Sequence, residues 1–281
     1  MKRIRRAYSK TVSLIDETAV QIYGSFVGKR RGFLLESYDK NNGRYVFIGK
    51  DPEEVITSKE NGLLIARADG ITKELNGNPV DLLKEYYSDF EIHKDDEQLA
   101  FTGGLVGGLG YDFVRYKEEL PDKNPDEIGI STISLMLVTE FLSIDHFAET
   151  MTAVVVEDDT EAGRKKAMFR CEEMVKEAFA NIQKDEKSEF QPDGKIIKQS
   201  DTLEEYSEKV NKIKQYIIDG HVFQTVLSQR WTIETKQKGF DLYKELRKIN
   251  PSPYMYYFNF EQFEIIGSSP EMIVKQKDNK V

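Results

Sequence analysis

Residues 250–257 of this chain read NPSPYMYY, and they lie between an expected helix and an expected pair of strands. The helix is predicted over residues 241–249. The Asn250–Pro251 step must end it, because the residue before a proline is disfavoured in the helical conformation. Residues 254–260 and 263–266 predict two paired strands, since such runs of aromatic and apolar residues suit a sheet. The segment therefore joins a helix to a strand pair through a rigid turn.

Upstream of this segment, the sequence predicts a second helix and a polar connection. Thr202 and Glu205 have the spacing of a capping box, and Gly220 supplies a helix stop. Five apolar residues at helical spacing predict the buried face of this helix: Leu203, Tyr206, Val210, Ile213 and Ile217. A β-rich run is expected over residues 222–233. The charged stretch 183–200 is predicted to be a surface connection and a domain boundary.

The first half of the chain alternates short β-rich runs with turns. Strands are expected over residues 44–48, 62–67, 133–138 and 151–156, the first of them after a turn at residues 41–43. Few helices separate these strands, which favours antiparallel sheets over a doubly wound fold.

A long helix is predicted over residues 161–182. Its apolar residues recur every three or four positions and form one stripe: Met168, Cys171, Val175, Ala178, Phe179 and Ile182. Because Cys171 lies on that stripe, we expect a buried structural residue and not a nucleophile.

Composition narrows the class of protein. The chain has 281 residues, enough for about two domains and a sizeable core. Its net charge of −9 argues against a nucleic-acid groove, because phosphate binding needs a basic surface. No stretch approaches the roughly 18 apolar residues of a membrane helix, and no secretory signal is expected. The single cysteine excludes an intramolecular disulfide and fits a reducing cytoplasm.

Two features that suggest a cofactor or a metal have simpler interpretations. Residues 101–112 read FTGGLVGGLGYD, but the spacing of the glycines does not match a phosphate-binding loop. Close packing of strands, or positive φ angles, accounts for these glycines. The histidines, His93, His146 and His221, lack metal-ligand spacing and are expected to be structural or surface residues.

Three segments together resemble the large subunit, component I, of anthranilate synthase, a chorismate-utilising enzyme family: residues 33–49, 101–115 and 216–271. The resemblance implies an α+β fold, a two-sheet β-sandwich with helices packed outside and an incomplete C-terminal part. It also implies two domains. Residues 1–190 would form the N-terminal domain with half of a tryptophan site, and residues 191–281 would begin the chorismate-binding domain.

The same resemblance implies an activity and its partners. Members of the family are lyases that convert chorismate and glutamine-derived ammonia to anthranilate and pyruvate, the entry to tryptophan biosynthesis. They use Mg²⁺, act in the cytoplasm and are feedback-inhibited by L-tryptophan. A glutamine amidotransferase subunit (component II) supplies the ammonia. No cysteine-containing amidotransferase motif occurs here, so we expect that activity on another chain.

Two distant segments are similar to the halves of the family's tryptophan site. Residues 34–37 read LLES, and residues 250–255 read NPSPYM. A hydroxyl and a carboxylate suit an α-ammonium group, and Tyr and Met suit an indole ring. The resemblance carries tryptophan binding over to five residues: Glu36, Ser37, Pro253, Tyr254 and Met255.

Two further residues match catalytic positions of the family. Gln224 stands where water-using relatives have a lysine that activates water. A glutamine cannot act as that base, so ammonia is expected to be the nucleophile. Glu271, in the run GSSPE at residues 267–271, matches the general acid that protonates the departing 4-hydroxyl of chorismate. That role needs a carboxyl whose pKa is raised by burial.

The family's segment for chorismate and Mg²⁺ has no counterpart before residue 281, so the isolated chain is expected to be inactive. The alternatives are aminodeoxychorismate synthase component I, which shares the ammonia chemistry, and a non-catalytic tryptophan-binding fragment. A structural sandwich without a ligand is a third alternative.

Overall fold

The computed structural model describes residues 3–14, 16–37, 43–94, 96, 99–121, 124–182, 190 and 192–276. The chain folds as two compact units, one made of Met1–Lys187 with Tyr243–Val281 and the other of Ser188–Leu242. These units do not test the domain division predicted at residue 190. Residues 41, 42 and 183–189, which belong to the expected turn and connection, lie outside the described residues.

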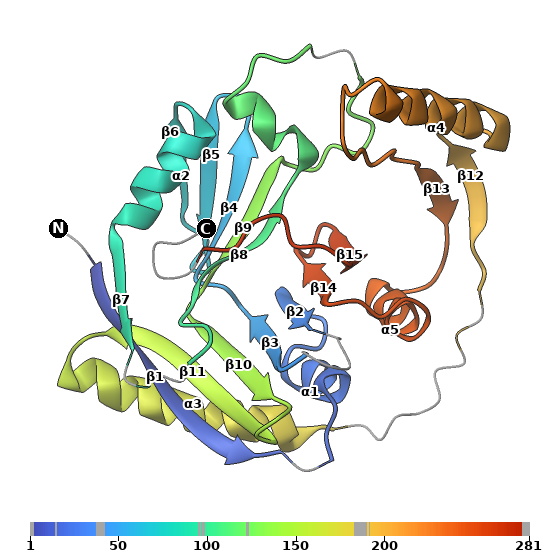
Figure 1. The fold of residues 1–281 in the computed structure, drawn as a ribbon. Coiled ribbons are helices and arrows are strands. Elements are labelled where there is room, and N and C mark those ends of the chain that lie inside the picture. Colours follow the sequence, from blue (N-terminus) through green and yellow to red (C-terminus); the bar gives the residue numbers. More distant parts are fainter. Residues whose placement is uncertain are drawn as a thin grey trace. The chain divides into compact units, whose positions relative to one another are not determined.

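The first unit contains an eight-stranded sheet that joins both ends of the sequence (Figure 1). In spatial order its strands are β15 (Glu264–Ser269), β14 (Tyr254–Asn259), β2 (Gly32–Glu36), β3 (Tyr45–Lys50), β10 (Glu140–Asp145), β11 (Thr150–Asp158), β1 (Arg3–Ser13) and β7 (Phe90–Lys94). Neighbouring strands are antiparallel except β1 and β7, which pair in parallel. The antiparallel character expected from the short connections is confirmed.

A five-stranded antiparallel sheet packs face to face against the first. Its strands are β6 (Thr72–Asn76), β5 (Gly62–Arg67), β4 (Glu54–Lys59), β9 (Ile133–Val138) and β8 (Gly104–Leu109). The core between the sheets takes Val106 and Met136 from this sheet and Phe33, Phe141 and Val154 from the other. Burying such apolar side chains is the main force that holds two sheets together.

Helices cover the outside of the sandwich (Figure 1). Helices α1 (Ala19–Phe26) and α3 (Glu161–Ala180) pack on the eight-stranded sheet, and α2 (Pro79–Ser88) lies against β5 and β7. A 3₁₀ helix, η1 (Tyr111–Tyr116), follows β8. The predicted α+β class, a two-sheet sandwich with helices outside, is therefore confirmed. Among the described residues, no helix is long and apolar enough to span a membrane.

Helix α3 confirms the predicted long helix and the burial of Cys171, whose side chain is fully buried. The residues of this helix that are fully buried form a line shifted from the predicted stripe. They are Gly163, Ala167, Cys171, Met174 and Ala178. Met168 and Phe179 of the predicted stripe are only partly buried. Small residues are buried on this line because α3 packs close to the sheet. At Gly163, an added Cβ would collide with the Asp158 carbonyl oxygen, so no side chain fits there.

The glycines of residues 101–112 serve close packing, as predicted. Gly103 has a φ of +90°, a value that side-chain-bearing residues rarely adopt. A Cβ at Gly107 would lie 2.2 Å from the Ser134 carbonyl oxygen of the neighbouring strand β9. Strand β8 can therefore approach β9 only because these positions lack side chains.

The second unit differs most from the sequence-based expectations. It contains β12 (Lys195–Gln199), α4 (Leu203–Ile218) and β13 (Trp231–Glu234), and the chain leaves it within α5 (Gly239–Ile249). The β-rich run predicted over residues 222–233 is wrong for 222–230, which form no strand. Part of the supposed connection 183–200 is β12. Among the described residues, β12 and β13 pair only with each other, so residues 222–230 have no neighbouring strand with which to form a sheet.

Helix α4 has its predicted capping box, Thr202 with Glu205, and three residues of the predicted face, Tyr206, Val210 and Ile213, are half-buried, while Leu203 and Ile217 are exposed. No residue of α4 is fully buried, and Leu203 is 76% exposed. Helical periodicity shows which face a helix can bury, while burial itself requires a partner of sufficient size. Within the described residues of the second unit, α4 has no partner large enough to bury this face fully.

Candidate functional site

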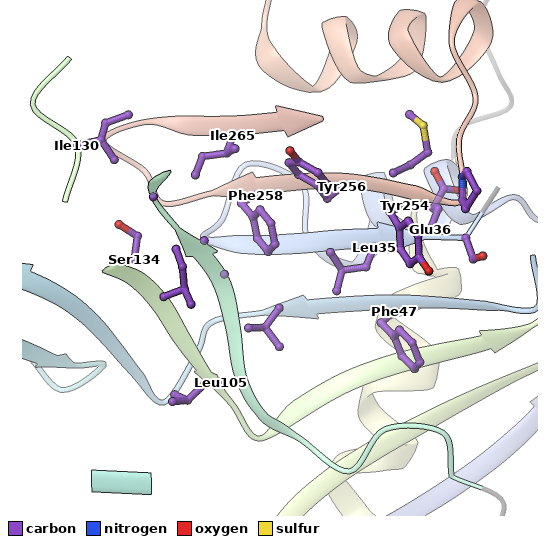
Figure 2. A pocket seen from close by; sticks show the side chains of 18 of the residues that line it. Leu35, Glu36, Phe47, Leu105, Ile130, Ser134, Tyr254, Tyr256, Phe258 and Ile265 are labelled. Carbon is purple, nitrogen blue, oxygen red and sulfur yellow. The ribbon is translucent and has the colours of Figure 1, made fainter. Parts of the chain in front are cut away.

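A cavity of about 860 Å³ opens between the two sheets of the first unit. Small-molecule sites are clefts of roughly 300–1,000 Å³ lined mainly by apolar side chains with a few polar groups. The aromatic part of the wall comes from Phe47, Tyr254, Tyr256 and Phe258. Figure 2 shows Glu36 and Tyr254 close together at one end of this cavity, and Ile130 and Ser134 at the other.

All five residues predicted for a tryptophan site line this cavity: Glu36, Ser37, Pro253, Tyr254 and Met255. They come from two distant segments that the sheet brings together. Strand β14 pairs antiparallel with β2, and Met255 stands directly opposite Glu36. The turn at residues 250–253 thus lies beside the end of β2. The predicted meeting of residues 34–37 with residues 250–255 is present in the fold.

The members of this group differ in exposure. Met255 is 1% exposed, whereas Tyr254 is 43% exposed, so the tyrosine ring is the accessible aromatic surface at this end of the cavity. The backbone N–H of Ser37 donates to the Tyr45 carbonyl oxygen, which continues the β2–β3 pairing and holds Ser37 against the sheet. At this end of the cavity, β2 is thus paired on both sides, with β14 and with β3.

The carboxylate of Glu36 is buried and accepts hydrogen bonds from two side chains of helix α5. The Tyr243 hydroxyl donates to Oε2, and the Arg247 guanidinium donates from Nε to Oε2 and from Nη2 to Oε1, at 2.9 and 3.0 Å. Burial, followed by the nearby charge of Glu36, raises the pKa of Tyr243 far above its usual range. Tyr243 therefore remains a proton donor to Glu36 at any physiological pH. Sequence reasoning missed Tyr243 and Arg247, whose only signal is their four-residue spacing on a helix.

The far end of the cavity is formed by the glycine-rich strand β8 and its surroundings. Residues 105–110 line it together with Ile130, Ser131 and Ser134. An added Cβ at Gly108 would lie 3.6 Å from Ile265 of strand β15. Strand β8 is at one edge of the five-stranded sheet, and β15 is at one edge of the eight-stranded sheet. The backbone and small side chains here keep the space between these two strands open.

The two residues predicted to be catalytic do not line the cavity. Glu271 follows β15 and is exposed, and its backbone N–H donates to the Ser269 hydroxyl at 3.4 Å. Gln224 is also exposed and belongs to the second unit, in the stretch without regular structure. The burial that a general acid requires is not found at Glu271, so both catalytic assignments stay predictions.

The histidines form no metal site in the part of the chain that the structure describes. There, no three side chains among His, Cys, Asp and Glu come together in a way that could hold a metal ion. His93 lies between Glu91 and Asp159, with ring nitrogens 3.1 and 3.2 Å from their carboxylate oxygens. His146 and His221 are exposed.

Comparisons with known proteins agree with this architecture. A family model described as chorismate binding enzyme matches residues 32–281. Anthranilate synthase component 1 of Acetivibrio thermocellus is 35% identical, over 94% of this chain and 56% of the relative. The protein of the same name from Aquifex aeolicus is 33% identical, over 96% of this chain and 56% of the relative.

A solved structure supports the same relationship. The crystal structure of anthranilate synthase component I from Streptococcus pneumoniae is similar with a TM-score of 0.61 and 26% sequence identity. That similarity covers 85% of this chain and 53% of the other. The chain spans about half the length of the curated relatives that it matches. Because the family model covers residues 32–281, this chain belongs to the chorismate-binding enzyme family.

Proposed function

We propose that this protein acts as component I of an anthranilate synthase and that its cavity at β2 and β14 binds L-tryptophan as a feedback inhibitor. The observation that supports the inhibitor site is the convergence of Ser37 with Pro253–Met255 on one apolar cavity. The relatives named anthranilate synthase component 1 support the reaction.

In the proposed reaction, chorismate and ammonia give anthranilate, pyruvate and water. A C–N bond forms to ammonia, the 4-hydroxyl leaves as water after protonation, and pyruvate is then eliminated. Glu271 is proposed to donate the proton. Gln224 is proposed to favour ammonia over water as the nucleophile, because an amide side chain cannot deprotonate water. The proposed partner is a glutamine amidotransferase subunit, and the proposed location is the cytoplasm.

Mg²⁺ is proposed as the cofactor on the family relationship alone. The metal would neutralise the carboxylates of chorismate. The described residues do not fit such a site, because they bring no three metal-ligating side chains together. We therefore assign no residue of this chain to metal binding.

Product analysis tests the reaction. The protein expressed from its own gene, given chorismate, Mg²⁺ and ammonium, is expected to release anthranilate and pyruvate, identified by chromatography. Accumulation of aminodeoxychorismate would instead identify the alternative enzyme of folate synthesis.

Calorimetry tests the inhibitor site independently of turnover. L-Tryptophan is expected to bind, and Ser37→Ala is expected to weaken binding about tenfold or more, the loss typical of a hydrogen bond to a charged group. Ser13→Ala, an exposed serine at the end of β1, is the matched control and should bind like the parent. Unchanged affinity in Ser37→Ala would remove Ser37 from the site. Tryptophan binding without any turnover of chorismate would favour the non-catalytic alternative.

A further inference from the structure

Glu36 occupies an unusual position for a ligand-binding carboxylate. It lines the cavity, yet its side chain is 1% exposed and its oxygens accept three hydrogen bonds from Tyr243 and Arg247. A carboxylate offers about four acceptor positions, so most of its capacity is already used inside the protein. An incoming ammonium group would have to displace buried, charge-assisted hydrogen bonds in order to reach it.

The contacts of Glu36 also hold both ends of one segment. Its carboxylate fixes Arg247 near the end of α5, while its backbone pairs with Met255 of β14. The short turn between them carries Pro253 into the cavity wall. The Ser268 hydroxyl of strand β15 also donates to the Asn250 carbonyl oxygen of that turn, at 2.6 Å. Residues 250–255 therefore lie between the contact of the Glu36 carboxylate with α5 and the backbone pairing of β2 with β14.

We propose that Glu36 is a positioning residue of the cavity and makes no contact with the ammonium group of a bound ligand. Its carboxylate anchors α5 through Tyr243 and Arg247, and the anchored helix places Pro253, Tyr254 and Met255. The ammonium group is then left to Ser37 and to backbone carbonyls. The ligand part of this inference rests on the proposed tryptophan site, whereas the anchoring part does not.

Hydrogen exchange tests the anchoring without any ligand. Glu36→Gln and Arg247→Met are each expected to speed exchange of the backbone amides at residues 254–259, and the double variant should match the single ones. Non-additive effects of this kind mark residues that act through one contact. The control, Arg6→Met, removes a similar two-bond arginine–carboxylate pair, with Asp159, on strand β1, which is five strands from β14 in the sheet, and should leave these amides unchanged. Unchanged exchange in both single variants would overturn the proposal.

Tyr243→Phe provides a milder variant in case a charge substitution prevents folding. It removes one hydrogen bond to Glu36 and keeps the ring that packs on Tyr257, with centroids 5.9 Å apart. It is expected to speed exchange at residues 254–259 by a smaller factor. Parent-like exchange in this variant, if it alone folds, would count against the anchor.

A pair of ligands separates positioning from direct contact. Indole-3-propionate differs from L-tryptophan by the missing amino group. If Glu36 positions the wall, Glu36→Gln weakens both ligands by the same factor, of about tenfold, within the range of coupled contacts. If Glu36 binds the ammonium group, only tryptophan is weakened, and the proposal is wrong. If the parent binds neither ligand, the tryptophan site itself fails, and the exchange experiment still decides the anchoring role.

Discussion

Cys171 illustrates how burial at a single residue decides chemistry. Its thiol is fully buried, lies 3.5 Å from the Ala153 carbonyl oxygen, and has its pKa raised to about 12 by burial. Since the thiolate is the reactive form, almost none is present at neutral pH. Iodoacetamide at pH 8 is expected to leave the folded protein unlabelled and to label the guanidinium-unfolded protein fully. Rapid labelling of the folded protein would contradict this.

The raised pKa of His93 predicts how the stability of the protein changes with pH. Hydrogen bonds to Glu91 first and then to Asp159 raise its pKa above the ordinary 6.5, while Arg6 shares Asp159. A raised folded-state pKa means that the contribution to stability is full below about pH 6.5 and is lost as pH rises through the folded value. Melting temperatures of the parent and His93→Asn should therefore differ at pH 6 and converge by pH 9. An equal difference at both pH values would exclude a role for the imidazolium.

The residues of the candidate site were predictable only in part. Ser37 and Pro253–Met255 were found through their resemblance to family segments, and the fold brings them to one cavity. Tyr243 and Arg247 carry no such signal. Their importance depends on a carboxylate 207 and 211 residues away, and no local pattern encodes that contact. Glu271 and Gln224 were equally visible in sequence, yet their exposure leaves their roles to experiment.

At the scale of elements, replacing two glycines of regular secondary structure with alanine is expected to change the stability of the protein in opposite directions. Gly107→Ala places a methyl group 2.2 Å from a backbone oxygen of β9 and should destabilise the protein by about 1–3 kcal/mol, as overpacking does. Gly24→Ala, in helix α1 with nothing within 4 Å, should stabilise it by about 0.5–1 kcal/mol. Denaturant titration of both variants checks the pair. A stabilising Gly107→Ala would show that β8 can move away from β9.

The accuracy of the predicted elements depended on their packing. Helix α5 and strands β14 and β15 were predicted closely, because the Asn250–Pro251 step ends one element and starts the next. The apolar run before Trp231 was mistaken for a strand. Composition alone suggests a strand there, but no neighbouring strand pairs with it. Local sequence signals therefore predicted an element correctly where the strand or helix that packs against it belongs to the same unit.

At the scale of the whole molecule, the two units should differ in protection from hydrogen exchange. Helices α3 and α4 are both capped by threonine, at Thr160 and Thr202, but α3 buries five residues and α4 buries none. Local opening costs little free energy where few apolar contacts are lost. Exchange of the α4 amides is expected to be at least about tenfold faster than that of α3. Equal protection would mean that α4 is stabilised by contacts beyond its own unit.

Glu36 and Arg247 are 211 positions apart in the sequence, so they are synthesised at different times. A ribosome adds about 5–20 residues per second, so roughly 10–40 seconds separate the appearance of these two residues. Until the later one appears, the edge of β2 that will receive β14 has no partner, and such an edge invites association with other chains. The ligand cavity therefore cannot form until both segments have been made, and during that interval the nascent polypeptide carries an open strand edge that can associate with other chains.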